Sequence, residues 1–394
     1  MFLKHLKLKN WRNFKSAEVD LSERIFLVGP NACGKSNFLD IFRFMRDIAK
    51  QPGGGLQKAV SDRGGLSKIR CLNAREDPMV ELEFHFSDSL GGNTKWKYLI
   101  GLRYEGKGRQ RTLISKEVVW KNNEKILDRP DKDDKKDDWR LTQTHLEQIN
   151  SNLNFRDIYD YFYQVRYFHI IPQLLRRPEI FFNTNIPKEE DAFGFHFLES
   201  IVETPIKTRE SRLKKIEKAL QTALPQLKNL SIKKDDRGVP HLEALYEHWR
   251  PKAGKQQEDQ FSDGTLRLIG FLWSLLEAGS LVLLEEPELS LHSFIIQKIP
   301  SLITQTQTSK KKKQQLIIST HSPDLLSDPG IGGEEILLFY PEKEGTKINR
   351  ASDNKEIRAL LENGFVPSEV VVPYTNPEKF VGQRRLFDNL EWAK

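Results

Sequence analysis

Apolar and polar residues alternate along the start of the chain in the pattern of β-strands. Residues 2–10 alternate lysine with leucine, which predicts a half-exposed strand, and a second strand is expected over 17–21. Residues 24–29 form a short apolar run that ends in glycine, which is typical of a buried strand that enters a tight loop. Apolar residues then recur at helical spacing over 36–49. The chain therefore begins as strand, loop and helix.

The next hundred residues predict a loop and a small antiparallel sheet. Residues 51–65 are rich in glycine and are expected to form a loop that has room for one short helix. Turn residues separate the strand-like segments that follow, which cover 79–86, 95–104 and 114–120. Residues 128–140 contain six aspartates and no apolar residue except Trp139, so we expect a solvated loop there.

An aromatic cluster at 154–167 has two interpretations. Such side chains stack on bases in nucleic-acid-binding proteins, but ordinary core packing is the more common reason for this spacing. Residues 168–172 resemble a strand that ends in a turn, and 207–227 have a helical pattern. The turn residues 235–238 lie between strand-like segments, which predicts a hairpin.

Composition narrows the class of protein. A length of 394 residues allows one large domain or two to three ordinary ones, and 10% aromatic residues exclude a disordered chain. No apolar run approaches the roughly 18 residues of a membrane span, so we expect a cytoplasmic protein without a membrane partner. Two cysteines exclude a disulfide scaffold and a cysteine-based zinc module. The net charge of +7 favours polyanionic partners without requiring them.

A phosphate-binding motif follows the buried strand. Residues 29–36 read Gly-Pro-Asn-Ala-Cys-Gly-Lys-Ser and fit the pattern G-x-x-x-x-G-K-[ST] between a strand and a helix. The glycines let backbone N–H groups surround phosphate oxygens at the helix N-terminus. Lys35 would reach the β- and γ-phosphates and Ser36 would ligate Mg²⁺. Cys33 is most simply a small loop residue. A chance match is the competing interpretation, and the later motifs argue against it.

Two carboxylates follow a second buried strand, which covers 281–284. Glu285 would hold the metal, directly or through water, and Glu286 would orient or deprotonate the attacking water. The alternative is a cluster of acids that caps a helix. Capping explains Glu288 better than it explains two acids directly after an apolar run.

Two further segments carry polar residues at defined places. A third apolar strand over 315–320 ends at His321, which would hydrogen-bond the γ-phosphate or the attacking water; a plain surface histidine is the alternative. Ser262 precedes a nearly all-apolar helix over 266–278 and is a good N-cap for it. Capping alone does not explain why Ser262 and Gly264 lie shortly before the buried strand at 281–284 and the two carboxylates that follow it.

These elements, in this order, resemble an ABC-type ATPase of the SMC, RecF and OLD group, within the AAA family ATPases. Residues 8–14 resemble the RecF-like start, and the Ser-Asp-Gly-Thr stretch at 262–265 corresponds to the ABC signature. The resemblance implies an α/β fold: an ABC-type P-loop head with a mixed sheet core, an antiparallel β subdomain and a compact helical lobe. It implies ATP and Mg²⁺ as cofactors. The nucleotide-binding residues that it implies are Arg12, Asn31, Ala32, Cys33, Gly34, Lys35, Ser36, Asn37, Ser262 and Gly264.

The same resemblance assigns the catalytic and metal-binding roles. Glu286, His321 and Lys35 are the expected catalytic residues. Ser36, Glu285 and Gln173 are the expected metal ligands, and Gln173 stands for the glutamine of the Q-loop.

The predicted domain boundaries follow from the motifs. They place the first ATPase part at 1–173, the helical lobe at 174–260, the signature and both later motifs at 261–340, and a C-terminal extension at 341–394. The helical lobe has only about 90 residues, which leaves no room for a long coiled coil. The chain after His321 contains no Asp-x-Asp pair, so we do not expect a nuclease domain there.

The resemblance implies a homodimer or higher homo-oligomer that holds ATP between its copies, because the signature of one chain completes the site of the other. The leading hypothesis is a switch that controls a separately encoded nuclease or toxin in bacterial anti-phage defence. The alternative is a RecF-like repair ATPase that binds DNA, with residues 310–313 as a candidate basic patch or a solvated loop. Residues 373–394 are expected to be a docked arm or a partner-binding segment.

Overall fold

The computed structural model describes the chain except for residues 51, 75–76, 78, 90, 107–110, 177–191, 222–223, 248–254, 278, 309–313 and 376–394. The predicted basic patch and nearly all of the predicted arm therefore lie outside the described residues. Within the described ranges, every helix is too short or too polar to cross a bilayer.

The first sheet is antiparallel and has the order β2-β1-β4-β5-β6-β7. Its alternating pattern puts one set of side chains into the core and the other toward solvent, as on β4, where buried and half-buried residues alternate. The strands are β1 (Phe2–Trp11), β2 (Phe14–Asp20), β4 (Val80–Ser87), β5 (Trp96–Tyr104), β6 (Thr112–Lys121) and β7 (Glu124–Arg129). The predicted antiparallel sheet is thus confirmed, and it also includes the first strands of the chain.

The second sheet is mixed and has the order β15-β14-β3-β13-β12-β8. Its strands are β3 (Arg24–Val28), β8 (Arg166–Phe168), β12 (Leu281–Glu285), β13 (Gln315–Thr320), β14 (Ile336–Glu342) and β15 (Gly345–Arg350). All pairs are parallel except β14 with β15. Helices cover both faces of this sheet, which explains why its central strands are continuous apolar runs rather than alternating ones.

The helices divide between two layers. On one side lie α1 (Lys35–Ala49), α2 (Leu56–Ser61), α3 (Leu66–Ile69) and α4 (Arg156–Tyr163). On the other lie α5 (Pro172–Arg176), α6 (Phe197–Glu203), α7 (Ile206–Leu220), α8 (Asp263–Leu276), α9 (Ser293–Ile296) and α10 (Ile299–Thr308). Successive residues of β3 point to opposite layers: Ile25 packs with α1 and the first sheet, and Phe26 packs with α8.

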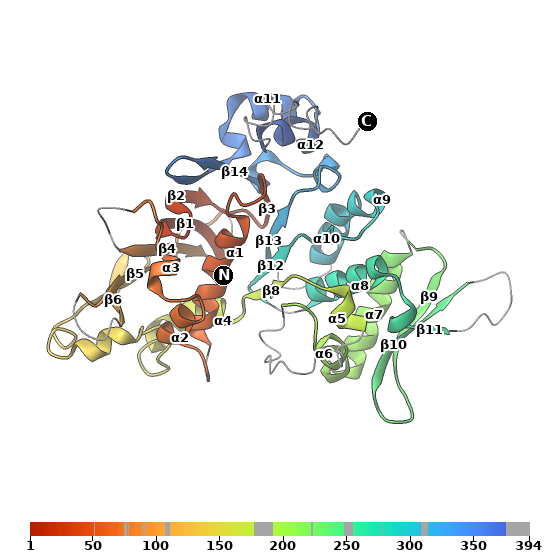
Figure 1. Cartoon of the computed structure of the whole chain (residues 1–394), viewed down its shortest axis with the longest axis horizontal. Coiled ribbons are helices and arrows are strands. Elements are labelled where there is room, and N and C mark those ends of the chain that lie inside the picture. The colour runs from red at the N-terminus through yellow and green to blue at the C-terminus, as the bar shows by residue number, and fades with distance from the viewer. Residues whose placement is uncertain are drawn as a thin grey trace, which may run out of the picture.

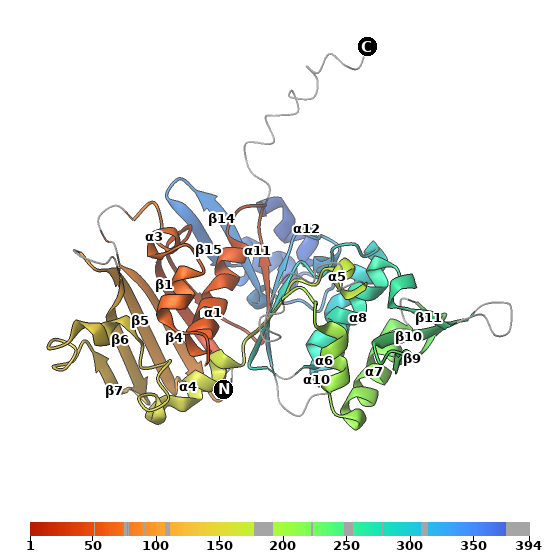
Figure 2. The same cartoon turned by 60° about the horizontal axis from the view of Figure 1, so that its bottom comes forward.

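Figure 1 shows the second sheet between two lobes, with the antiparallel sheet on the left and the helical lobe on the right. The helical lobe also contains a small sheet of β9 (Leu227–Lys234), β10 (Pro240–Tyr246) and β11 (Lys255–Gln257). Beyond β15 the chain forms α11 (Lys355–Glu362) and α12 (Pro367–Val371). Figure 2 shows the same two lobes on either side of the second sheet from another direction.

One buried side chain joins the two large sheets. Gln315, at the start of β13, accepts a hydrogen bond from the backbone N–H of Leu3 at 2.7 Å and donates one to the carbonyl of the same residue at 2.8 Å. The hydroxyl of Tyr161 donates to the same amide oxygen at 3.0 Å. The amide is thus fully used where three elements meet, as a buried polar group requires.

Two local expectations need correction, and a third is confirmed. The strand expected at 168–172 lies at Arg166–Phe168, and Pro172 begins α5, since the fixed φ of proline suits the start of a helix. The helix expected over 207–227 ends at Leu220. The aromatic cluster is mostly core, as favoured: Phe155, Tyr161 and Phe162 are buried.

The aspartate-rich segment is not simply a solvated loop. Arg129 and Asp134 are only 2% and 1% exposed. The guanidinium of Arg129 donates to Asp134 at 2.9 Å and to Glu117 of β6 at 2.8 Å. This buried charge network attaches the segment to the antiparallel sheet. The sequence did not reveal the network, because its one buried aspartate lies among exposed aspartates.

We predict that Arg129→Met lowers the free energy of unfolding by about 3–5 kcal/mol, because it leaves the buried carboxylate of Glu117 without its cation and leaves Asp134 with only the exposed Arg140. Denaturant titration measures the change. The matched control is Lys125→Met, because Lys125 forms an exposed ion pair with Asp128 and should cost about 1 kcal/mol or less. Equal effects of the two substitutions would contradict the prediction.

Candidate functional site

Parallel pairing brings the ends of three strands to one edge of the second sheet. In the register of β3, β13 and β12, Val28 lies opposite Thr320, and Ser319 lies opposite Glu285. Ligand sites of open α/β sheets lie at the carboxyl ends of such strands. The three polar segments predicted from the sequence therefore meet at one place.

The loop at 29–36 needs unusual backbone conformations. Ala32 and Gly34 have φ values of 61° and 104°. A Cβ on Gly34 would lie 2.1 Å from the side-chain nitrogen of Asn13, so only glycine fits there. Asn31 is exposed, whereas Cys33 is buried and burial raises the pKa of its thiol, which agrees with a packing residue.

Asn13 holds this loop from the β1–β2 turn, a role that sequence reasoning missed. Its side-chain nitrogen donates to the carbonyl of Cys33 at 3.0 Å and to the hydroxyl of Thr346 at 2.6 Å. Its side-chain oxygen accepts from Asn37 at 2.8 Å. Asn13 follows the arginine singled out in the sequence, and no local pattern distinguishes it from a turn asparagine.

Lys35 places a buried cation under the loop. Its ammonium donates to the carbonyls of Gly29 at 2.9 Å and Pro30 at 3.0 Å, and lies 3.4 Å from Nδ1 of His321. Burial lowers the pKa of Lys35, because the charged form has lost most of its water. A phosphate group is the kind of anion that could accept the hydrogen bonds that the Lys35 ammonium now donates to these carbonyls.

The hydroxyl of Ser36 donates to Oε1 of Glu285, at the start of α1 and the end of β12 respectively. The other carboxylate oxygen, Oε2, accepts from the hydroxyl of Tyr167 on β8. The guanidinium of Arg43 lies 4.2 Å from the centre of the Tyr167 ring. Burial and the nearby Glu285 charge raise the pKa of Tyr167, so its hydroxyl keeps its proton at neutral pH.

Glu286 and His321 form a second pair at the same edge. Nε2 of His321 lies 3.0 Å from Oε1 of Glu286. Burial and the neighbouring Lys35 lower the pKa of His321, so the neutral ring donates from Nε2 and presents Nδ1 to Lys35. Glu286 itself has a φ of 45°, in the left-handed region that is uncommon for residues other than glycine.

Glu288 was distinguished from Glu285 and Glu286 in the sequence, and in the structure its carboxylate supports the end of β13. It is 7% exposed and accepts from the hydroxyl of Thr320 at 2.6 Å and from the backbone N–H of His321 at 3.1 Å. Burial raises its pKa. Capping of a helix was the alternative interpretation that suited Glu288 best, but in the structure its carboxylate instead fixes the end of β13, next to His321.

The donor set at Ser36 and Glu285 suits Mg²⁺, because a hydroxyl and a carboxylate are the hard oxygen ligands that this cation prefers. In the described part of the chain, no group of three or more histidines, cysteines, aspartates or glutamates could hold a metal ion. A Mg²⁺ ion bound here would therefore take its remaining ligands from water and phosphate, as is usual for this cation.

The signature segment, residues 262–265, begins α8 and lies in the layer on the opposite side of the second sheet from α1. Ser262 caps α8, and its hydroxyl accepts from the N–H of Thr265 at 3.1 Å. A Cβ on Gly264 would lie 3.0 Å from the carbonyl of Ser290, so the segment packs on the loop after β12. Among the described residues, no hydrogen bond joins Ser262 or Gly264 to the loop at 29–36.

The remaining predicted residues lie at the margins. Arg12 donates to Asp40 at 2.9 Å and lines a pocket of about 580 Å³ next to Ser36. Gln173, on α5, donates to Asp263 at 2.9 Å. Within the described chain, no hydrogen bond connects Gln173 with Ser36 or Glu285, and its role as a metal ligand stays a prediction.

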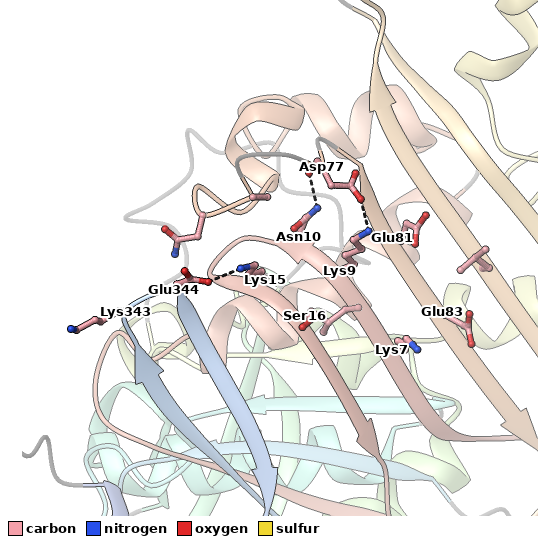
Figure 3. Close-up of a pocket in the computed structure, with 14 residues that line it drawn as sticks. Lys7, Lys9, Asn10, Lys15, Ser16, Asp77, Glu81, Glu83, Lys343 and Glu344 are labelled. Atoms are coloured by element: carbon pink, nitrogen blue, oxygen red, sulfur yellow. Dashed lines mark hydrogen bonds and ion pairs between the residues drawn. The ribbon is translucent and has the colours of Figure 1, made fainter.

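A larger pocket, of about 630 Å³, lies on the outer face of the antiparallel sheet beside the β14–β15 turn (Figure 3). Two of its lysines pair with acids of the same pocket: Lys9 with Asp77, and Lys15 with Glu344. These pairings weaken its case as a site for a strongly charged ligand.

Solved structures share the fold. An SMC head bound to the C-winged helix domain of ScpA is 14% identical, with a TM-score of 0.50, and the match covers 89% of this chain and 97% of that one. An SMC head with an extended coiled coil from Pyrococcus furiosus is 12% identical, with a TM-score of 0.51 and coverage of 92% and 99%. At such identities the likeness shows the fold alone. The predicted ABC-type head is confirmed: the chain has the fold of an ATPase of the SMC/RecF kind.

Sequence relatives agree over short stretches. The DNA replication and repair protein RecF of Synechocystis sp. is 34% identical over 84 residues, which are 21% of this chain and 22% of that protein. RecF of Oenococcus oeni is 56% identical over 41 residues, 10% of this chain and 11% of that protein. The aligned parts thus span at most about a fifth of these relatives. Residues 24–327 match the family described as AAA domain, putative AbiEii toxin, Type IV TA system, and the chain belongs to this family.

We predict that Asn13→Ala lowers the free energy of unfolding by about 1–3 kcal/mol, because it removes hydrogen bonds that hold the loop at 29–36. Thermal or denaturant unfolding checks the change. The control is Asn31→Ala in the same loop, where the side chain is exposed and the expected change is within about 0.5 kcal/mol. A neutral Asn13→Ala would show that the loop does not depend on this side chain.

Proposed function

We propose that two copies of this chain bind ATP between them, hydrolyse it, and thereby switch a separately encoded effector, a nuclease or toxin, in bacterial anti-phage defence. The observation that carries the ATPase part is the meeting of Lys35, Ser36, Glu285, Glu286 and His321 at the ends of three parallel strands.

The residues divide the chemistry between them. Lys35 and the backbone N–H groups of the loop bind the phosphates, and Ser36 and Glu285 hold Mg²⁺. When bound, Mg²⁺ neutralises charge on the phosphate oxygens. Glu286 accepts the proton of the attacking water, and the neutral His321 holds the Glu286 carboxylate in place through Nε2.

The dimer part rests on the separation of the signature from the phosphate loop. In one chain Ser262 caps its own helix and has no bond to the loop, and its segment packs on the loop after β12. A second copy that turns this segment toward the bound γ-phosphate completes the site. Loss of that phosphate on hydrolysis then loosens the dimer, which is the switching event.

The effector part is supported by the family, whose description refers to a putative toxin of a type IV toxin–antitoxin system. The second candidate is a RecF-like ATPase that binds DNA in repair, which the matches to DNA replication and repair proteins favour. Duplex DNA binding by the purified protein alone, weakening steeply with salt, would support repair. Co-purification of a protein encoded beside it would support the effector.

We predict that Lys35→Ala weakens ATP binding at least about tenfold, because it removes a buried charge that is aimed at the phosphates. Titration with a fluorescent ATP analogue measures this. Lys214→Ala, which changes an exposed lysine of α7, serves as the control with unchanged affinity. Unchanged affinity of Lys35→Ala would remove the loop from the ATP site.

We predict that Glu286→Gln slows ATP hydrolysis about 10²-fold or more, because an amide cannot accept the proton of the attacking water. ATP should still bind, so the variant is expected to remain a dimer with ATP by light scattering. Phosphate release comparable to the wild type would overturn the role of Glu286.

A mixing experiment tests whether the site is shared between copies. Lys35→Ala and Ser262→Arg proteins are each expected to be inactive, whereas an equimolar mixture regains part of the activity. In the mixed dimer, one site combines the intact loop of one copy with the intact signature of the other. A mixture without activity, from variants shown to dimerise, would place the whole site in one chain.

A further inference from the structure

Tyr167 is joined to the metal-binding carboxylate by a contact that the proposed mechanism does not use. It lies on β8, the edge strand beside β12, opposite Leu283 and therefore two residues from Glu285 in register. Its side chain is 9% exposed, and its hydroxyl donates to Oε2 of Glu285. Oε1 of the same carboxylate accepts a hydrogen bond from the hydroxyl of Ser36.

Two donors on different oxygens fix the orientation of a carboxylate. A single contact would leave the Glu285 group free to rotate about its last torsion, because terminal sp³–sp² torsions are broad. With Oε2 engaged by Tyr167, Oε1 stays directed at Ser36. The Glu285 carboxylate is thus held in a fixed orientation toward Ser36, the residue with which it would share a metal ion.

The tyrosine ring is itself held in place. The guanidinium of Arg43 lies 4.2 Å from the ring centre, within the range of a cation–π interaction. Arg43 comes from α1, the helix that begins with Lys35 and Ser36. The ring of Tyr167 therefore projects from β8 and contacts α1, the helix that carries Ser36.

We propose that Tyr167 is a positioning residue for the Mg²⁺ site, which keeps Glu285 aimed at the ion through the hydrogen bond of its hydroxyl. This inference rests on the proposed function, because it takes Ser36 and Glu285 as the metal ligands. Groups that hydrogen-bond a metal ligand typically change metal affinity 10- to 100-fold when they are removed.

The test uses Tyr167→Phe, which keeps the ring and its packing and removes only the hydroxyl. Binding of a fluorescent ATP analogue to the full chain is measured in EDTA and across a Mg²⁺ titration. We expect the Mg²⁺ concentration for half-maximal enhancement of binding to rise about tenfold, with affinity in EDTA within about twofold of the wild type. ITC with Mg²⁺ in the presence of a non-hydrolysable ATP analogue gives a second readout that needs no turnover.

Two further variants separate positioning from packing. Tyr163→Phe is the matched control, because Tyr163 lies on α4, is 38% exposed and stacks on Tyr159, away from the metal ligands; its Mg²⁺ dependence should be that of the wild type. Adding Tyr167→Phe to Glu285→Gln should change Mg²⁺ dependence little, because the carboxylate through which the hydroxyl acts is already gone.

The outcomes distinguish the inference from the function on which it rests. If the wild type binds ATP with Mg²⁺ and Tyr167→Phe has the same Mg²⁺ dependence, the positioning role is wrong and the proposed function stands. Equal loss of affinity in EDTA and in Mg²⁺ would make Tyr167 merely structural and also overturn the inference. A wild type without Mg²⁺-dependent ATP binding would overturn both.

Discussion

Parallel pairing of β3, β13 and β12 is the constraint on which the site depends. Parallel strands all finish at the same edge, and the register puts the last residues of the three strands side by side. The phosphate loop, which precedes the pair of acids by 249 residues, therefore becomes a neighbour of both the acids and the histidine. A shift of one residue in this register would turn the side chains at the strand ends toward opposite faces.

Charge at this edge is arranged before any ligand arrives. The ammonium of Lys35 is held by loop carbonyls, which are weaker partners than phosphate oxygens, and a neutral His321 separates it from Glu286. Burial destabilises the charged form of Lys35 and so lowers its pKa, and an anionic ligand would stabilise that charged form. Donors held in this way need little reorganisation when charge develops on a phosphate.

The parts of the molecule that the sequence predicted well are those with local causes. Each central strand contains a short apolar run, α1 has a regular apolar face, and the loop at 29–36 is a contiguous motif, so each could be located from its own residues. Helix α8 and its cap at Ser262 were found for the same reason. The coarse architecture was implied by the family resemblance that these motifs carry in their order.

What the sequence could not reveal depends on contacts between distant segments. Tyr167 lies on a strand of three residues, too short to show a period, and reaches a carboxylate more than a hundred residues away. The Arg129 network is hidden in a run of exposed aspartates, because composition does not distinguish a buried acid from a solvated one. Gln173 was proposed because it follows an apolar strand and precedes the helical part, and its hydrogen bond to Asp263, 90 residues away, has no local signal.

Gln315 has a mechanical consequence. Its amide bonds to both backbone groups of Leu3, as a neighbouring strand would, so the first strand of the antiparallel sheet is tied to the base of β13. His321 follows directly at the far end of β13. A displacement of Leu3 away from β13 would therefore break buried hydrogen bonds. The antiparallel sheet is thus joined directly to the strand whose opposite end leads into His321.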